Sequence, residues 1–441
     1  MKKANNIEPS LAGGFVIFTG ELTYAFPVKH LIFNFFETET LPIFVFYYLV
    51  NMVMQLIEVT TPALAKEFIR TNVELNGSNP AYIRPIDKEI NQVFDPNYNR
   101  AFRQGEVIRW VLKDDEGRLI GRIAAFVNKK YKNKGDDVPV GGVGFFDSIN
   151  SQEAADMLLD VARHWLGQRG MEAMDGPINF GERDNWWGLL VEGFREPLYS
   201  MNFNPPYYKD LLENYGFKPF FHQLCFGMDP MKPLSDKVLQ RHAVVAADPL
   251  YSSDTLKKAN LEKYAEDFLA VYNGAFAGHG GMKQMRKEQV MQLFRKMKPL
   301  LDENIAWFAY YDKKPIAMFL NLPELNQYFK HFNGKFGLLQ KLQFVWLKMR
   351  GACKHFTGVV FAIVPEFQGK GVDAYIIVEM AKVVQPAKFY VHYEMQWIGD
   401  FNPKMVNVAR TLGDSHVSRK LTTYRYLFDR SKEFKRHPML T

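Results

Sequence analysis

The fold is decided by one stretch of the chain, which reads Phe361-Ala362-Ile363-Val364-Pro365-Glu366-Phe367-Gln368-Gly369-Lys370-Gly371-Val372-Asp373-Ala374. Its apolar start is typical of a strand, and its end is typical of a helix that begins after a glycine-containing turn. The N-terminus of a helix exposes unpaired backbone N–H groups, which can donate hydrogen bonds to a diphosphate. Gly369 and Gly371 lack a Cβ atom and let the backbone approach phosphates closely, while Lys370 adds positive charge. A plain tight turn is the alternative interpretation.

The sequence around this stretch predicts alternating strands and helices. In the C-terminal half, strands are predicted over 251–256, 305–311, 315–320, 356–364, 389–398 and 417–428, and helices over 261–276, 287–301, 371–384 and 403–412. Pro386 is expected to end the third of these helices. This order gives a hairpin, then a crossover from strand through helix to strand, then a closing strand.

The N-terminal half repeats the same order. Strands are predicted over 55–59, 106–112, 118–127, 140–148, 173–178 and 217–228, and helices over 61–75, 150–167 and 207–215. Asn150 and Glu153 are expected to cap the second helix. We therefore expect an α/β fold with a mixed sheet in each of two tandem domains, 54–228 and 248–430, with a connector at 229–247 and a tail at 431–441.

The glycine-containing turn resembles the acetyl-CoA loop of the GCN5-related N-acetyltransferase (GNAT) superfamily. Gln368 and Gly371 match that pattern, whereas Asp373 stands where the superfamily has Gly or Ala. The resemblance continues through 394–398, Asn402, Ala409 and 412–413. In the N-terminal half, 175–180, 188–194 and 204–208 resemble a bacterial subgroup of tandem acetyltransferase-like proteins. Together these segments cover about 54–430 and imply two tandem acyl-CoA N-acyltransferase-like domains.

The resemblance implies acetyl-CoA as co-substrate, no metal, and an amine on a small molecule or peptide as acceptor. The pantetheine arm would lie as an extra strand along the backbone of Ala362 and Ile363, whose N–H groups would polarise the thioester carbonyl. Asn402 would contact the cofactor near the pantetheine. The diphosphate would be held by Gln368 and by the backbone of Gly369, Lys370, Gly371, Val372, Asp373 and Ala374.

An amine nucleophile also needs a proton acceptor. Three side chains are candidates: Glu394 on the strand after the loop, His392 on the same face of that strand, and Glu366 at the mouth of the loop. Each is alternatively a solvated or hydrogen-bonded structural residue. The superfamily often places a tyrosine acid on its last helix, but 406–412 contains no tyrosine.

The N-terminal half is predicted to bind no acyl-CoA. Its corresponding loop, 145–153, contains no glycine and carries Asp147 and Glu153 where a diphosphate would sit. Like charges oppose phosphate binding there. We expect Asn179, Trp186 and Trp187, together with 204–208, either to shape an acceptor pocket or to pack between the halves.

The composition is that of a globular protein, because 47% of the 441 residues are hydrophobic and 23% are charged. A net charge of +7 suits an anionic cofactor, and without a long Lys/Arg run nucleic-acid binding is a minor alternative. Cys225 and Cys353 belong to no metal-binding motif, so we expect buried thiols in a cytoplasmic protein.

Residues 1–53 differ from the rest of the sequence. The apolar stretch 31–54 is interrupted by Glu37 and Glu39, and its cleanest run, 41–50, is shorter than the roughly 20 apolar residues that span a bilayer. We expect the natural start near Met52 or Met54, with a peripheral membrane-binding segment as the alternative. Residues 278–281, a glycine-rich segment, are interpreted as a mobile loop.

Three functions are compatible with these features. The leading one is transfer of an acetyl or other short acyl group from CoA to an amine. The alternatives are an aminoacyl-tRNA-dependent transferase of tandem fold and a non-catalytic acyl-CoA-binding protein. A salt-dependent affinity for tRNA would favour the second, and binding of acetyl-CoA without release of free thiol would favour the third.

Overall fold

The computed structural model describes residues 54–181, 183–276 and 284–440. The predictions for 1–53 and for the glycine-rich segment 278–281 lie outside these residues. The N-terminal half contains β1 (Gln55–Glu58), α1 (Pro62–Asn76), α2 (Asp87–Val93), β2 (Gly105–Lys113), β3 (Leu119–Asn128), β4 (Val140–Ser148), α3 (Gln152–Gly167), β5 (Ala173–Gly176), β6 (Leu189–Glu192), α4 (Tyr208–Tyr215) and β7 (Lys218–Met228).

The C-terminal half follows with a similar order and one insertion, α8 and α9. It contains α5 (Asp236–Ala246), β8 (Tyr251–Thr255), α6 (Leu261–Phe276), α7 (Lys287–Met297), β9 (Ala306–Tyr311), β10 (Lys314–Pro323), α8 (Asn326–Phe329), α9 (Leu338–Met349), β11 (His355–Ile363), α10 (Val372–Ala387), β12 (His392–Gly399), α11 (Pro403–Arg410) and β13 (His416–Leu427).

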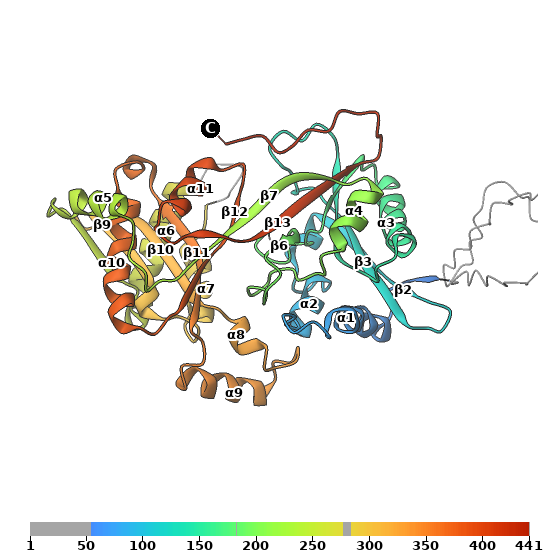
Figure 1. Ribbon diagram of the computed structural model, residues 1–441, viewed down its shortest axis with the longest axis horizontal. Helices are drawn as coiled ribbons and strands as arrows, with labels where there is room; N and C mark the ends of the chain where they lie inside the picture. The colour runs from blue at the N-terminus through green and yellow to red at the C-terminus, as the bar shows by residue number, and fades with distance from the viewer. Residues whose placement is uncertain (1–53, 182, 277–283, 441) are drawn as a thin grey trace, which may run out of the picture.

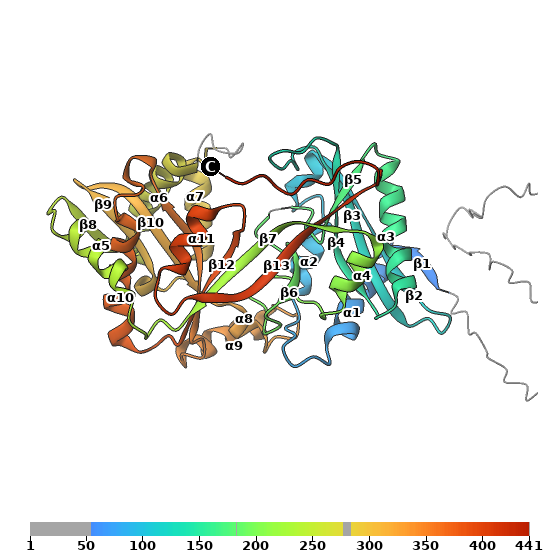
Figure 2. The ribbon, with the colours of Figure 1, turned by 45° about the horizontal axis from the view of Figure 1, so that its top comes forward.

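The two halves share one mixed sheet, in which each half is completed by the last strand of the other. The strand order is β1-β2-β3-β4-β5-β13-β7-β12-β11-β10-β9-β8, so β13 pairs with β5 and β7 pairs with β12. Figures 1 and 2 show β7 and β13 side by side where they run from one half to the other. The predicted α/β fold with a mixed sheet is confirmed, and the exchange of closing strands joins its halves.

Helices cover both faces of the sheet because successive strand residues point to opposite sides. In β10, Ala317 and Phe319 pack with the α10 side chains, whereas Met318 between them packs with α6 and α7. The N-terminal half repeats this arrangement, with α3 and α4 on one face of the sheet and Phe68 of α1 on the other. Cys225 and Cys353 are free and buried, as expected.

Two local predictions were wrong, and several helices were not predicted. The cap of α3 is Ser151, whose hydroxyl accepts from the Ala154 N–H, and not Asn150. Pro386 does not stop α10, because in the last turn a proline removes one hydrogen bond only. The helix runs to Ala387 and is followed by the cap residue Lys388 at φ 50°. The segment 229–247 contains the helix α5, which packs against α10. The helices α8 and α9 were not predicted.

Candidate functional site

The parallel strands β11 and β12 pair over four positions only and then part. Their register runs from His355 opposite His392 to Gly358 opposite Met395. Beyond this point β11 continues to pair with β10, and β12 pairs with β7. Among the described residues no strand covers the free side of β11 from Val359 onward. A strand edge of this kind offers backbone N–H and C=O groups to an extended ligand.

A β-bulge lies at the position where the strands part. Leu320 of β10 pairs with Val360 and the next residue, Asn321, pairs with Gly358, which leaves Val359 as the extra residue on β11. The Val359 side chain is 42% exposed. Bulges re-aim backbone groups and are frequent beside active sites. The sequence analysis did not identify Val359, because a bulge depends on pairing with another strand.

The free edge of β11 leads directly to the helix N-terminus predicted to bind phosphate. After a short 3-10 turn, Pro365–Phe367, the Gln368 side-chain amide donates to the Ile363 carbonyl at 2.9 Å and closes the turn. Gly369 has φ 74° and no neighbouring atom within 4 Å of where a Cβ would stand. Gly371, at φ 87°, is the N-cap of α10, and no side chain caps the helix. The first backbone N–H groups of α10 are therefore free of a side-chain partner.

Asp373 does not oppose an anion at this turn as its charge alone would suggest. Its carboxylate is largely buried and pairs with the Arg241 guanidinium of α5. Lys370 lies over the Phe367 ring, with its Nζ 5.2 Å from the ring centre. Because Arg241 neutralises the one acidic side chain in the first turn of α10, the local charge fits a diphosphate.

A cavity of about 360 Å³ lies at the paired ends of β11 and β12, between the two halves. Loop residues 195–198 of the N-terminal half form one wall, and Glu324 with Gln327 forms another. Inside it, Glu394 receives two parallel bonds from Arg419, 2.6 Å from Nε to Oε1 and 2.9 Å from Nη2 to Oε2. Arg419 and Glu394 are both almost completely buried.

The Glu394 carboxylate is held in its charged form. Burial raises its pKa, but the hydrogen bonds from His392, Arg419 and Ser418 and the Arg419 charge outweigh burial and hold the pKa well below the usual range. A carboxylate this acidic and this fully bonded is a weak proton acceptor. The hydrogen bonds of Glu394 therefore fit a residue that positions a neighbouring side chain better than they fit a base.

His392 is oriented by Glu394. Its Nε2 lies 3.2 Å from Glu394 Oε2, and a charged carboxylate oxygen can only accept a hydrogen bond. In the neutral form of the ring, Nε2 therefore carries the proton, which leaves the lone pair of Nδ1 as an acceptor. The His392 side chain is 25% exposed and lines the cavity beside His355, whose ring centre is 5.2 Å away. Burial, followed by the neighbouring His392 and Lys330 side chains, lowers the pKa of His355.

Glu324 is a second titratable group of the cavity, and no sequence motif pointed to it. Its Oε1 accepts from the backbone N–H groups of Tyr199 at 2.8 Å and Asn326 at 3.0 Å, whereas its buried Oε2 has no partner among the described residues. Burial raises the pKa of Glu324 to about 7 against the lowering effect of these two bonds. Two carboxyl groups in one cavity with opposite pKa shifts are typical of acid–base sites.

The remaining predicted residues are distributed as follows. Glu366 is exposed in the 3-10 turn and is not part of the cavity wall. The Asn402 side chain caps α11 by accepting from the Met405 N–H at 3.3 Å. Ala362 is buried, and Ile363 is partly buried at the end of β11 next to the turn. Arg419, which lies 25 residues beyond Glu394, was missed because only the exchanged strand β13 brings the two together.

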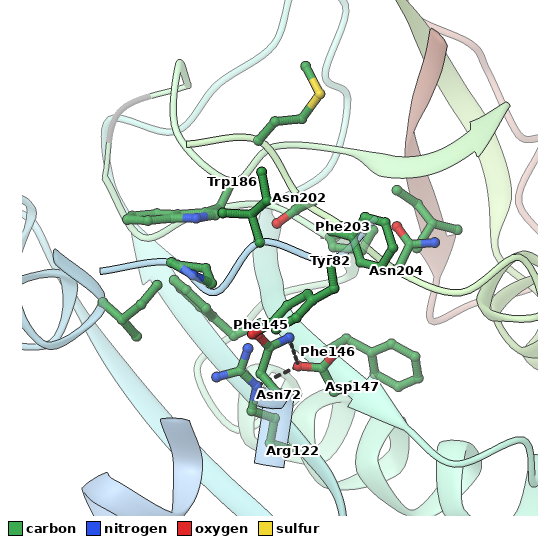
Figure 3. Close-up of a pocket in the computed structure, with 16 residues that line it drawn as sticks. Asn72, Tyr82, Arg122, Phe145, Phe146, Asp147, Trp186, Asn202, Phe203 and Asn204 are labelled. Carbon is green, nitrogen blue, oxygen red and sulfur yellow. Dashed lines mark hydrogen bonds and ion pairs between the residues drawn. The ribbon is translucent and has the colours of Figure 1, made fainter. Parts of the chain in front are cut away.

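The corresponding loop of the N-terminal half is filled by its own side chains, as Figure 3 shows. Asp147 is buried and accepts from Arg122 Nε at 2.6 Å and from Asn72 Nδ2 at 2.9 Å. The cavity beside it measures only about 50 Å³. The Ile178 N–H donates to the Val143 carbonyl at 2.7 Å and so occupies the side of β4 beyond its pairing with β5.

The residues predicted to shape an acceptor pocket divide into two groups. Asn179, Trp186 and Trp187 line a cavity of about 750 Å³ that Lys296 of the other half also borders. The Asn204 side chain, in contrast, bonds the backbone of Leu190, and Tyr208 is buried against Asp147. The segment 204–208 therefore stabilises the N-terminal half.

No protein-family model matches the chain. The chain is 25% identical over 388 residues to the bacterial ceramide synthase of Caulobacter vibrioides (strain NA1000 / CB15N), covering 85% of this chain and 97% of that protein. It is 24% identical over 371 residues to Protein YghO of Escherichia coli (strain K12), covering 80% and 90%.

Solved structures of acyltransferase-like proteins are also similar over most of the chain. A tandem GNAT protein from the clavulanic acid biosynthesis pathway has 11% identity, covers 86% of this chain and 100% of its own, and gives a TM-score of 0.48. FemX has 11% identity, coverage of 86% and 98%, and a TM-score of 0.36. Within the described residues, no helix is long and apolar enough to span a membrane, and no group of three His, Cys, Asp or Glu side chains could hold a metal.

Proposed function

We propose that this protein transfers an acyl group from acyl-CoA to the amine of a lipid. The observation that carries the proposal is the parting of β11 and β12 between an uncapped helix N-terminus and a cavity of titratable side chains. Similarity to a bacterial ceramide synthase supports the acceptor class, because that enzyme name implies N-acyl transfer to a sphingoid amine.

The residues around α10 fit the diphosphate of CoA. Backbone N–H groups from Gly369 to Ala374 would donate to it, with Gly369 leaving space and Lys370 adding charge. The free edge of β11 at Ala362 and Ile363 would receive the pantetheine arm, and Asn402 remains a proposed contact. The bulged Val359 is the added candidate, since its backbone N–H lies where the strands part and can stabilise charge on the thioester oxygen.

His392 is the proposed proton acceptor, and Glu394 is the residue that positions it. As the amine nitrogen bonds to the thioester carbonyl carbon, its proton passes to His392 Nδ1 and the C–S bond breaks. Glu324, with a pKa of about 7, exchanges protons in the same cavity. The cavity of about 360 Å³ is larger than an acetyl group and has room for a longer acyl chain. Acetyl-CoA is therefore compared with longer acyl-CoA donors.

Thiol release tests this proposal. Purified protein is given acetyl-CoA or palmitoyl-CoA with sphinganine, and free thiol and N-acylated product are measured. We expect product with at least one donor, and a kcat about 10²- to 10⁴-fold lower in His392→Gln with unchanged acyl-CoA affinity. Acyl-CoA binding without product for any long-chain amine would leave a binding protein. Activity that requires charged tRNA would instead support the aminoacyl-tRNA-dependent alternative.

A further inference from the structure

The helix α9 presents a large apolar face to solvent. Six of its side chains are between 48% and 75% exposed: Leu338, Leu339, Leu342, Val345, Trp346 and Met349. At about 100° per residue these positions form one continuous stripe along the helix. Figure 1 shows α9 at the lower edge of the molecule, away from the shared sheet. Exposed apolar side chains that form one contiguous patch, as these six do, mark interaction sites.

The orientation of this face is fixed by packing on the opposite side of the helix. Phe344 and Leu347 are buried in a cluster that also contains Tyr328 and Phe329 of α8. The Phe344 and Tyr328 rings meet edge to face, with their centres 4.8 Å apart. The exposed stripe is therefore presented by a helix that is anchored to the protein.

Basic side chains border the stripe on both sides, and acidic ones are absent. On the helix, Lys341 and Lys348 lie on one flank of the stripe and Arg350 lies on the other. The sequence contains no Asp or Glu from Leu325 to Pro365, whereas it contains Lys330, Lys335, Lys341, Lys348, Arg350 and Lys354. Trp346, an aromatic residue typical of membrane interfaces, lies against Arg350 at 4.8 Å.

We propose that α9 is an in-plane docking helix for an anionic phospholipid surface. An apolar stripe flanked by Lys and Arg matches acyl chains bordered by acidic headgroups. The inference rests on α9 and does not depend on the proposed reaction. It connects to the candidate site through α8, since Glu324 and Gln327 at the start of the same insertion form a wall of the cavity.

Vesicle flotation of the full chain tests the docking helix. We expect binding to vesicles of phosphatidylcholine with phosphatidylglycerol, weaker binding to phosphatidylcholine alone, and weakening by NaCl. The triple variant Leu338→Glu/Leu342→Glu/Met349→Glu is expected to lose more than about tenfold in affinity. A matched control, Val244→Glu/Leu250→Glu/Met439→Glu, adds the same charge at exposed apolar side chains outside α9 and is expected to bind like the parent.

Two results would overturn the proposal. The first is no vesicle binding by the full chain, which would mean that another segment or a second copy covers α9; sedimentation of the parent and of the α9 variant would reveal the second copy. The second is equal loss in the α9 variant and in its control, which would mean that net charge alone drives binding. Circular dichroism of both variants shows that each is folded.

Discussion

In the N-terminal half, the crossover from β4 to α3 buries Asp147 against Arg122 and caps its helix with Ser151. In the C-terminal half, the crossover from β11 to α10 exposes Gly369 and leaves the helix without a side-chain cap. The first path satisfies its polar groups internally, and the second leaves them for a ligand. A few side chains thus decide whether the same backbone route is closed by its own polar groups or left open, as the proposed ligand site requires.

The largest effect is expected from breaking the buried pair of the N-terminal crossover. Asp147→Asn leaves the Arg122 charge buried without its partner, which should lower the free energy of unfolding by about 3–5 kcal/mol. Urea denaturation measures this loss, with the exposed Asp115→Asn as control. Acyl-CoA affinity of the folded variant should stay unchanged; a parallel loss of affinity would show that this crossover also binds the cofactor.

A smaller effect on stability is expected at Glu324, whose carboxylate, unlike that of Asp147, has one oxygen without a partner among the described residues. Because burial raises the folded-state pKa of Glu324 from 4.5 to about 7, the folded protein holds a proton that the unfolded chain releases in between. Stability from this group is therefore present at low pH and is lost as the pH rises towards 7. Between pH 4 and pH 8 the parent should therefore lose about 3 kcal/mol of stability that the Glu324→Gln variant keeps.

Urea midpoints at the two pH values give this difference, and Glu433→Gln at an exposed carboxyl is the control. If the Glu324→Gln variant and the parent show the same pH dependence, Glu324 titrates normally and its place in the proton chemistry is lost.

The smallest effect is expected at the N-terminal helix cap. Ser151→Ala removes the hydroxyl that accepts from Ala154 and should cost about 1 kcal/mol of stability. Asn150→Ala, at the residue that the sequence suggested as cap, should be close to neutral. Thermal unfolding compares the two, and a larger loss for Asn150→Ala would reassign the cap.

The sequence predicted most strands and helices because their apolar periods face a core. It did not predict α9, because most apolar residues of that helix face solvent and only a narrow side of the helix faces a core. The exchange of β7 and β13 left no local signal, because the residue pattern of a strand does not show which half of the sheet the strand completes. Glu324, Arg419 and the Asp373–Arg241 pair were missed or left open because they depend on contacts between distant segments.

The strand, turn and helix from β11 to α10 were predictable, in contrast, because they follow one another in the chain. Gly369 and Gly371 both have positive φ, a conformation that favours glycine, so the sequence itself marks the turn. The bidentate bonding of Glu394 was not predictable, because its partner Arg419 lies on another strand.

The most direct test of the account is acyl-CoA binding to the pair Gly369→Asp and Gly369→Asn, measured by calorimetry. Both side chains impose the same shape and the same backbone conformation at φ 74°, where Asn and Asp are tolerated, and they differ only in charge. We predict that the parent binds, that Gly369→Asp binds at least about tenfold more weakly than Gly369→Asn, and that NaCl narrows the gap. Equal affinity in the two variants, or no binding by the parent, would contradict a diphosphate site at the start of α10.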